Sequence, residues 1–163
     1  MSIAILSDIH DHLSNLRRAL AAVEESEALI CCGDLCSPFV AKELAEGFAG
    51  PVHIVFGNND GDRWRLGMNA QRHPHLHFHG EYAELEFGGR SFAVQHFDSP
   101  GRALARGGTF DVVCFGHNHR FEITREGSTL IINPGEVFGG LTGQATCALY
   151  DPATHEARRV NLG

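Results

Sequence analysis

The chain has 163 residues, of which 43% are hydrophobic and 20% are charged, and this composition predicts one globular domain over residues 1–163. The formal net charge of −7 argues against strong binding to long nucleic acid, which needs a basic surface. No apolar run approaches the roughly 20 residues that span a membrane, and the first apolar run is too short for a signal peptide. We therefore expect a cytoplasmic protein with no membrane partner.

The first part of the chain alternates between strands and helices. Apolar runs and helical spacing predict, in order, a strand at 2–7, a helix at 12–25, a strand at 28–33, a helix at 38–46 and a strand from Val52. Ser37 is the expected N-cap of the second helix and Pro38 its first residue. This alternation is typical of a parallel sheet with helices between its strands.

The second part is richer in strands. A short helix is expected at 60–67 and another at 100–106. Strands are expected at 76–79, 82–87, 90–96, 111–116, 120–125, 129–132, 145–150 and 155–161. Gly88-Gly89 should form the turn of a hairpin. Together the two parts predict two packed sheets with helices outside, although the pattern does not give the order of the strands.

Residues of the metal-ligating kind follow five of the apolar runs, where each buried strand should surface. They are Asp8 with His10, Asp34, Asn58, His96, and His117 with His119. In an extended segment residues two apart point the same way, so Asp8 and His10 should aim at one point. A single Asp after a strand is usually a turn former. Five coincidences at the strand ends, where layered α/β folds place their sites, favour a metal centre.

These motifs resemble those of the calcineurin-like metallophosphoesterases. The resemblance is carried by Asp8-x-His10, Gly33-Asp34, Gly57-Asn58, His96 and Gly116-His117-x-His119. Asp11, Asn15-Leu16 and Asn133-Pro134-Gly135 look like the small bacterial and archaeal phosphodiesterase branch of that family. The resemblance extends over residues 2–135 and implies an α/β fold, namely a four-layer αββα sandwich of two packed mixed β-sheets with the site along one edge.

The resemblance also implies two divalent metal ions and their ligands. One ion would take Asp8, His10 and His119, the other would take Asn58, His96 and His117, and Asp34 would bridge both. Carboxylate, imidazole and amide ligands together suit manganese, the expected metal, with iron, zinc, cobalt and nickel as alternatives. A hydroxide between the ions would then hydrolyse a small phosphate ester, most simply a phosphodiester.

Asn59 and two aspartates are weaker catalytic candidates. Asp11 and Asp60 could orient the metal ligands or could equally cap helices. Many relatives carry histidine where this chain has Asn59, and an asparagine amide cannot transfer a proton. We therefore expect a preference for diesters with good leaving groups, unless Asn59 only caps a helix and another group, such as His12, supplies the proton.

Other side chains leave two interpretations open. Arg63 and Phe97 could contact substrate, or could be a solvated helix residue and a core residue. Trp64, like Phe97, could stack on a leaving group, with core packing as the ordinary alternative. The alternating histidines of residues 73–79 could form an accessory metal stripe or a solvated strand face. The Cys36 thiol could approach the metal site.

Other classes of function remain as alternatives to an enzyme. The same fold serves as a non-catalytic scaffold in the retromer coat, and a structural metal protein without turnover is a third interpretation. All seven ligand positions are filled here, which favours catalysis. The expected partner is a small phosphate ester, and a homo-oligomer is compatible with the sequence.

Overall fold

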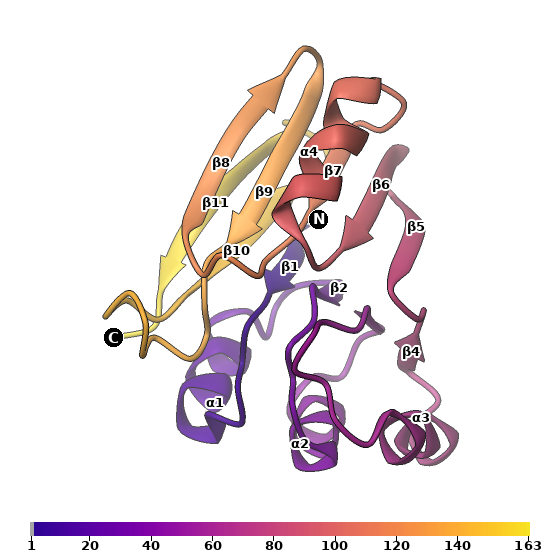
Figure 1. Ribbon diagram of the computed structural model, residues 1–163, viewed down its shortest axis with the longest axis vertical. Coiled ribbons are helices and arrows are strands. Elements are labelled where there is room, and N and C mark those ends of the chain that lie inside the picture. The colour runs from indigo at the N-terminus through magenta and orange to yellow at the C-terminus, as the bar shows by residue number, and fades with distance from the viewer. Residues whose placement is uncertain (1) are drawn as a thin grey trace.

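Two mixed β-sheets and four helices make up the fold in the computed structural model, which describes residues 2–163 (Figure 1). The strands are β1 Ile3–Leu6, β2 Ala28–Cys31, β3 Val52–Ile54, β4 Leu76–Phe78, β5 Tyr82–Phe87, β6 Arg90–Gln95, β7 Val112–Cys114, β8 Phe121–Glu126, β9 Thr129–Pro134, β10 Thr146–Asp151 and β11 Glu156–Asn161. The helices are α1 Leu13–Ala22, α2 Pro38–Gly47, α3 Arg63–Arg72 and α4 Asp98–Gly107.

The strand order explains why the first part of the sequence reads as parallel and the second does not. One sheet has the order β11-β10-β1-β2-β3-β4, and the other has the order β5-β6-β7-β9-β8. Strands β1 to β4 are parallel, and the C-terminal hairpin β10–β11 joins them antiparallel at β1. In the second sheet β6, β7 and β9 are parallel, with antiparallel β5 and β8 at the edges.

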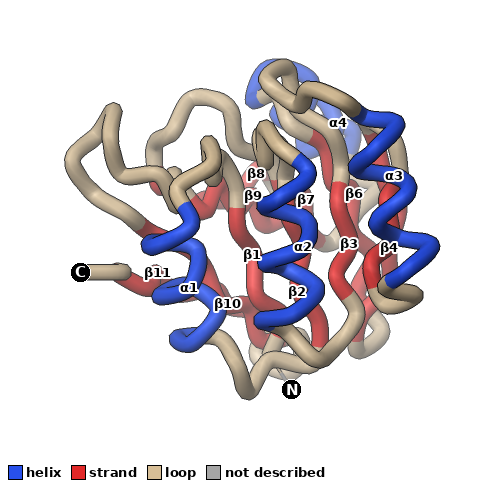
Figure 2. Tube along the Cα trace, turned by 90° about the horizontal axis from the view of Figure 1, so that it is seen from below, coloured by secondary structure: helices blue, strands red, loops and turns tan. Residues whose placement is uncertain are grey.

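The layers follow from which face of each strand is apolar. Helices α1, α2 and α3 cover one face of the six-stranded sheet, as Figure 2 shows, and bury a core that includes Leu16, Leu44 and Leu66. The other faces of the two sheets meet around Phe92 and Tyr150. Helix α4 covers the outer face of the second sheet. The expected αββα sandwich of two mixed sheets is thus confirmed.

Most element boundaries lie within a few residues of their predicted positions. Helix α3 is the main exception, because it begins at Arg63 and continues to Arg72, whereas a helix at 60–67 was expected. Its N-cap is Asp62, which accepts the backbone N–H of Arg65. The Gly88-Gly89 turn has positive φ at both residues, 57° and 74°, and this is the requirement that selects glycine there.

Helix α4 packs on its sheet through a glycine, and we predict opposite effects for two glycine-to-alanine changes. A Cβ at Gly101 would collide with the Phe115 ring and lie 2.7 Å from Gln95 Nε2. Gly101→Ala should therefore lower the free energy of unfolding by about 1–3 kcal/mol. At Gly67 in α3 no described atom lies within 4 Å of an added Cβ, so Gly67→Ala should raise it by about 0.5–1 kcal/mol. Urea unfolding of both variants checks this, and equal shifts would contradict it.

Candidate metal centre

The loops after β1, β2, β3, β6 and β7 converge at one edge of the sandwich and bring the predicted ligands together. One atom from each of Asp8, His10 and His119 lies within 4.8 Å of the others, and the same holds for Asp8, Asp34 and His96. The two groups share Asp8, and Asp34 links them further. Its Oδ2 lies 3.5 Å from His10 Nε2 and 3.5 Å from His96 Nε2. A carboxylate between two sets of imidazoles can serve two cations at once.

The remaining predicted ligands lie on the same edge. Asn58 Oδ1 is 3.0 Å from His96 Nε2, and the His117 ring lies 5.1 Å from the His96 ring. The backbone N–H of His117 donates to Asp8 Oδ2 at 3.0 Å, which fixes the β7 loop against the β1 loop. His96 in turn is oriented from behind, because its Nδ1 lies 2.7 Å from the carbonyl oxygen of Cys32.

The backbone at this edge is left-handed at most of the predicted ligands. These are Asp8, His10, Asp34, His117 and His119, with φ of 53°, 45°, 56°, 69° and 62°. Non-glycine residues in this region are strained and cluster at functional sites. The expectation that Asp8 and His10 converge because they alternate along an extended strand is therefore wrong. Strand β1 ends at Leu6, and tight left-handed turns aim both side chains instead.

Asp60 is the hydrogen-bonding hub behind these turns. Its buried carboxylate accepts four backbone N–H groups, two at each oxygen. Oδ1 accepts from Leu35 and Cys36, at 2.7 and 2.9 Å, and Oδ2 accepts from Asp34 and Gly57, at 3.0 and 2.6 Å. Asp60 therefore ties the β2 loop to the β3 loop. The helix-capping interpretation of Asp60 is wrong, because Asp62 caps α3.

Glu136 is a site residue that the sequence analysis missed. Its buried carboxylate lies 2.7 Å from His119 Nδ1 and accepts hydrogen bonds from Thr142, at 2.7 Å from both the N–H and the hydroxyl. A carboxylate on the far nitrogen fixes the tautomer and direction of a ligating imidazole. The available signal was its position directly after Asn133-Pro134-Gly135, one of the motifs behind the family resemblance.

Each of the weaker catalytic candidates forms hydrogen bonds with another residue of the protein. Asp11 Oδ1 accepts the N–H of Ser37, the N-cap residue of α2, and thereby links the loop after β1 to the start of that helix. Asn59 donates twice to Asp34, from its backbone N–H to Oδ1 and from its side-chain amide to Oδ2, at 2.8 Å each. His12 is the N-cap of α1 and accepts the N–H of Asn15.

The side chains proposed to contact substrate differ in exposure and in how far protein hydrogen bonds already occupy them. Arg63 donates to Glu81 Oε1 at 2.9 Å and to the carbonyl oxygen of Gly57 at 3.0 Å, so its guanidinium is engaged on the β3 loop. Phe97 is partly exposed, and its ring lies 4.9 Å from the His117 ring. Trp64 is 81% exposed, which rules out core packing for this side chain. Cys36 Sγ lies 3.6 Å from His10 Nδ1, while burial raises the pKa of its thiol to about 12.

The buried polar atoms test whether these residues suit metal ions. Among the side chains of residues 2–163, three fully buried polar atoms have no hydrogen-bond partner, namely Ser7 Oγ, Asp8 Oδ1 and His10 Nε2. Burying a polar atom without a partner costs about 1–3 kcal/mol. Asp8 Oδ1 and His10 Nε2 are 3.7 Å apart and belong to the first ligand group. Their surplus lone pairs fit a divalent cation.

Hydrogen bonding keeps Asp34 in its ionised form. Burial raises the pKa of the Asp34 carboxyl, but hydrogen bonds from His96 and from both N–H groups of Asn59 outweigh burial and hold that pKa below its usual range. For His96, burial lowers the pKa of the imidazole, and the hydrogen bond and charge of Asp34 raise it further than burial lowers it. An ionised carboxylate is the form that binds cations.

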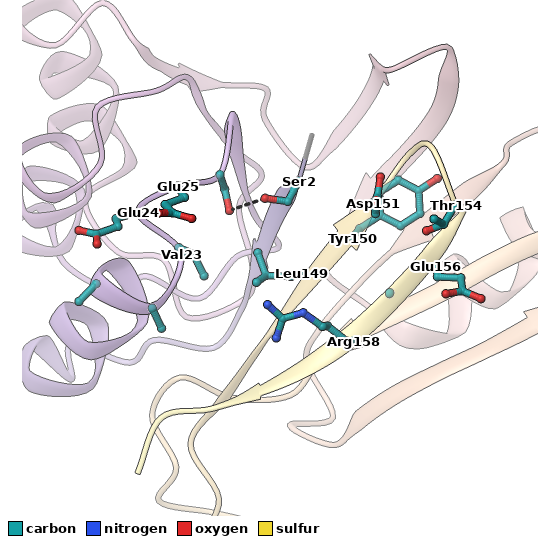
Figure 3. Close-up of a pocket in the computed structure, with 14 residues that line it drawn as sticks. Ser2, Val23, Glu24, Glu25, Leu149, Tyr150, Asp151, Thr154, Glu156 and Arg158 are labelled. Carbon is teal, nitrogen blue, oxygen red and sulfur yellow. Dashed lines mark hydrogen bonds between the residues drawn. The ribbon is translucent and has the colours of Figure 1, made fainter.

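A separate cavity of about 530 Å³ lies at the opposite end of β1 (Figure 3). Ser2, just before β1, lines it together with Glu24, Glu25, Asp151 and Arg158 from the end of α1 and the β10–β11 hairpin. Three of these five side chains are carboxylates, which repel a phosphate group.

No helix within residues 2–163 is long and apolar enough to cross a membrane.

Comparison with known proteins agrees with this arrangement. Residues 1–155 match the calcineurin-like phosphoesterase superfamily domain. The chain is 34% identical over 166 residues to phosphodiesterase MJ0936 of Methanocaldococcus jannaschii, covering 99% of both chains. A solved archaeal phosphodiesterase superposes with a TM-score of 0.91 at 33% identity, covering 99% of both chains. Vacuolar protein sorting 29 of Cryptosporidium parvum, at 20% identity and a TM-score of 0.69 over 98% of this chain and 95% of that one, shares the fold.

We predict that Asp60→Asn strongly destabilises the protein. The new amide nitrogen replaces one carboxylate oxygen, so two of the four backbone N–H groups lose their acceptor. At about 1–3 kcal/mol for each buried donor, the free energy of unfolding should fall by about 2–6 kcal/mol. Asp62→Asn is the matched control, since asparagine caps helices as well as aspartate. Urea unfolding measures the stability of both variants. A decrease below about 1 kcal/mol in the free energy of unfolding of Asp60→Asn would show that these hydrogen bonds to Asp60 contribute little.

We predict that Glu136→Gln weakens metal binding through His119. Glutamine keeps the size of the side chain but removes the charge that orients the imidazole, and such changes cost about 10–100-fold in metal affinity. Calorimetric titration with Mn²⁺ measures the change. Glu122→Gln is the control. Glu122, on β8, pairs with Arg102 of α4 and contacts none of the predicted ligands. An unchanged affinity in Glu136→Gln would show that the contact has no role in metal binding.

Proposed function

Since the chain belongs to the calcineurin-like phosphoesterase superfamily, we propose that it is a dinuclear metal-dependent phosphodiesterase. The observation that carries the proposal is the position of Asp34 between two groups of ligand side chains, 3.5 Å from one imidazole of each. The 34% identity to a phosphodiesterase over the whole chain supports the same reaction class. The expectations of a single domain, manganese, a cytoplasmic location and a homo-oligomer stay predictions.

The proposed ligands divide into two sets around Asp34. Asp8, His10 and His119 would hold one ion, Asn58, His96 and His117 would hold the other, and Asp34 would contact both. When bound, two divalent ions supply the positive charge that activates a water molecule at neutral pH and stabilises the phosphoryl oxygens.

Residues around the ligands set their direction before any ion binds. Asn59 fixes the plane of the Asp34 carboxylate with two hydrogen bonds. Glu136 holds the His119 ring so that Nε2 faces Asp8, 3.4 Å from its Oδ1. We assign Asn59 a positioning role rather than an acid role, because its backbone N–H and its side-chain amide each donate to Asp34 and an amide does not transfer a proton.

The surroundings of Phe97 favour a diester with an aromatic leaving group. Phe97 borders a mainly apolar cavity of about 570 Å³, lined also by Tyr82, Pro100, Leu104 and Phe110. An aromatic group bound there would extend away from the metal ligands along α4. Because Asn59 cannot transfer a proton, a leaving group that departs as a stable anion is favoured, and an aryl oxide is such a group whereas an alkoxide is not.

The scaffold alternative has less support. The likeness to vacuolar protein sorting 29 is at 20% identity and shows the fold alone. In this chain all seven ligand positions carry ligating side chains, and two buried atoms among them have unsatisfied lone pairs.

The test of the proposed function is metal-dependent hydrolysis of bis-p-nitrophenyl phosphate with metal counting on the same samples. We predict that Asp34→Ala loses both metals and all turnover, because both sets depend on its carboxylate. Asp8→Ala should keep one metal, since Asn58, His96 and His117 remain around Asp34. Atomic emission gives the stoichiometry. Retention of two metals by Asp34→Ala would show that Asp34 does not bridge the two ions. Absence of hydrolysis by the wild type with each of the five metals would refute the proposed enzymatic activity.

We predict that Phe97→Ala raises KM for aryl diesters. Losing one aromatic contact costs about 1–1.5 kcal/mol, or roughly 5–10-fold in KM. The effect should appear with bis-p-nitrophenyl phosphate and be smaller with a diester whose leaving group is a small aliphatic alcohol. Steady-state kinetics on the two substrates measure the difference. Equal changes for both would show that Phe97 supports the metal ligands rather than the leaving group.

A further inference from the structure

Three histidines meet at the free edge of the six-stranded sheet, apart from the ligands described above. His53 lies on β3, His77 lies opposite it on β4, and His79 follows two residues later. Strand β4 is the last strand of its sheet, and β5 begins the other sheet directly after it in the chain (Figure 1). We refer to His53, His77 and His79 as the edge histidines.

The backbone register places all three side chains on one face of the sheet. Val52 and Ile54 point into the core beneath the helices, so His53 between them points to the opposite face. There its ring contacts Phe87 of the second sheet at 5.6 Å. His77 pairs in register with His53, and His79 keeps contact with β3 by donating its backbone N–H to the carbonyl oxygen of Ile54.

Two nitrogens of the edge histidines are close enough to share one ion, whereas the third histidine must turn toward them. His53 Nδ1 and His79 Nε2 are 3.0 Å apart. Two nitrogens bound at about 2.0–2.1 Å to one tetrahedral ion lie about 3.3–3.4 Å from each other, so a small movement suffices. The His77 ring stacks on the His53 ring with centroids 5.0 Å apart, which brings a third imidazole within reach by rotation of its side chain.

The surroundings favour the neutral form of His53 and His79 and give none of the edge histidines an anionic partner. The ion pairs found within residues 2–163 include none of the edge histidines. Burial and the neighbouring histidines lower the pKa of His53 to about 4, and burial and His77 lower the pKa of His79. Neutral imidazole is the form that ligates metals. His53 and His79 share one hydrogen bond between their ring nitrogens, and a cation is a partner that all three imidazoles could hold in common.

The other histidines of the 73–79 stripe do not join them. His75 Nε2 lies 3.0 Å from the carbonyl oxygen of Ala45 at the end of α2, and His73 is the C-cap of α3. Strand β4 is an edge strand, as the solvated-face interpretation of the stripe requires, and only His77 and His79 of the stripe lie beside His53. Residues 77 and 79 pair across the sheet with His53, which is more than twenty positions earlier in the chain.

We propose that the edge histidines form a second metal site that binds one zinc-class divalent ion, such as Zn²⁺, Ni²⁺ or Cu²⁺. A site built from imidazole alone suits these metals and disfavours Mn²⁺, Mg²⁺ and Ca²⁺, which need oxygen ligands. The ligands therefore distinguish this site from the Asp34 centre, which combines carboxylates with imidazoles. Three protein ligands leave a fourth tetrahedral position for water or an added donor.

The test compares bound zinc and bound manganese in the full-length wild type and the double variant His77→Gln/His79→Gln. Both positions are exposed, so the substitutions should not disturb folding. Each protein is saturated with one metal, freed of excess by gel filtration and analysed by atomic emission. We expect the variant to bind one Zn²⁺ fewer per chain than the wild type and the same amount of Mn²⁺. Because the result is a difference, it does not depend on how many ions the Asp34 centre holds.

His75→Gln is the matched control, since it removes a histidine of the same segment that lies outside the group. It should bind as much zinc as the wild type. Equal zinc content in the wild type and the double variant would overturn the second site, and so would a loss that His75→Gln reproduces. Failure of diester hydrolysis in the wild type would refute the phosphodiesterase proposal and leave the zinc difference intact.

Discussion

The carboxylate of Asp60 is the contact on which the metal centre depends. It receives backbone N–H groups from the turn after β2 and from the turn after β3, and thereby ties together two loops that are also joined by the Asn59–Asp34 hydrogen bonds. Four donors on one buried carboxylate also explain why the turns need no regular structure of their own. Asp34 lies in this arrangement, so its backbone is held by Asp60 while Asn59 fixes the plane of its carboxylate.

The second constraint is close packing of backbone against the ligands. A Cβ at Gly57 would collide with the Asp34 carboxylate, and a Cβ at Gly116 would collide with the Ser7 hydroxyl and lie 2.5 Å from Asp8 Oδ2. These two glycines, each directly before a predicted ligand, therefore provide room for a ligand from another loop. Left-handed backbone at Asp8 and Asp34 is strained, and the backbone N–H groups that donate to Asp60, with the hydrogen bonds between the loops, offset that strain.

The local pattern of apolar residues in the sequence predicted most of the fold. The features that it did not predict depend on contacts between distant segments of the chain. Apolar runs fixed the strands because both faces of β1 and β2 are buried, and the strand ends located the candidate ligands. The sequence could not reveal that Glu136 faces His119 or that His53 faces His79, because those contacts arise only when the strands pair. It also could not show that left-handed turns, rather than strand alternation, aim Asp8 and His10. In each case the missing information is a backbone dihedral or a tertiary pairing.

Charge balance links the ligands to the substrate. Asp8, Asp34, Asp60 and Glu136 place four buried carboxylates around the centre in a chain that already has a formal net charge of −7. A phosphate diester approaching these groups alone would be repelled. Arg63 does not compensate, because its guanidinium is held by Glu81 and the Gly57 carbonyl. The proposed divalent cations would offset this repulsion, and metal binding would then precede substrate binding. That order predicts a strong dependence of KM on metal occupancy, and a KM that is independent of metal concentration would contradict it.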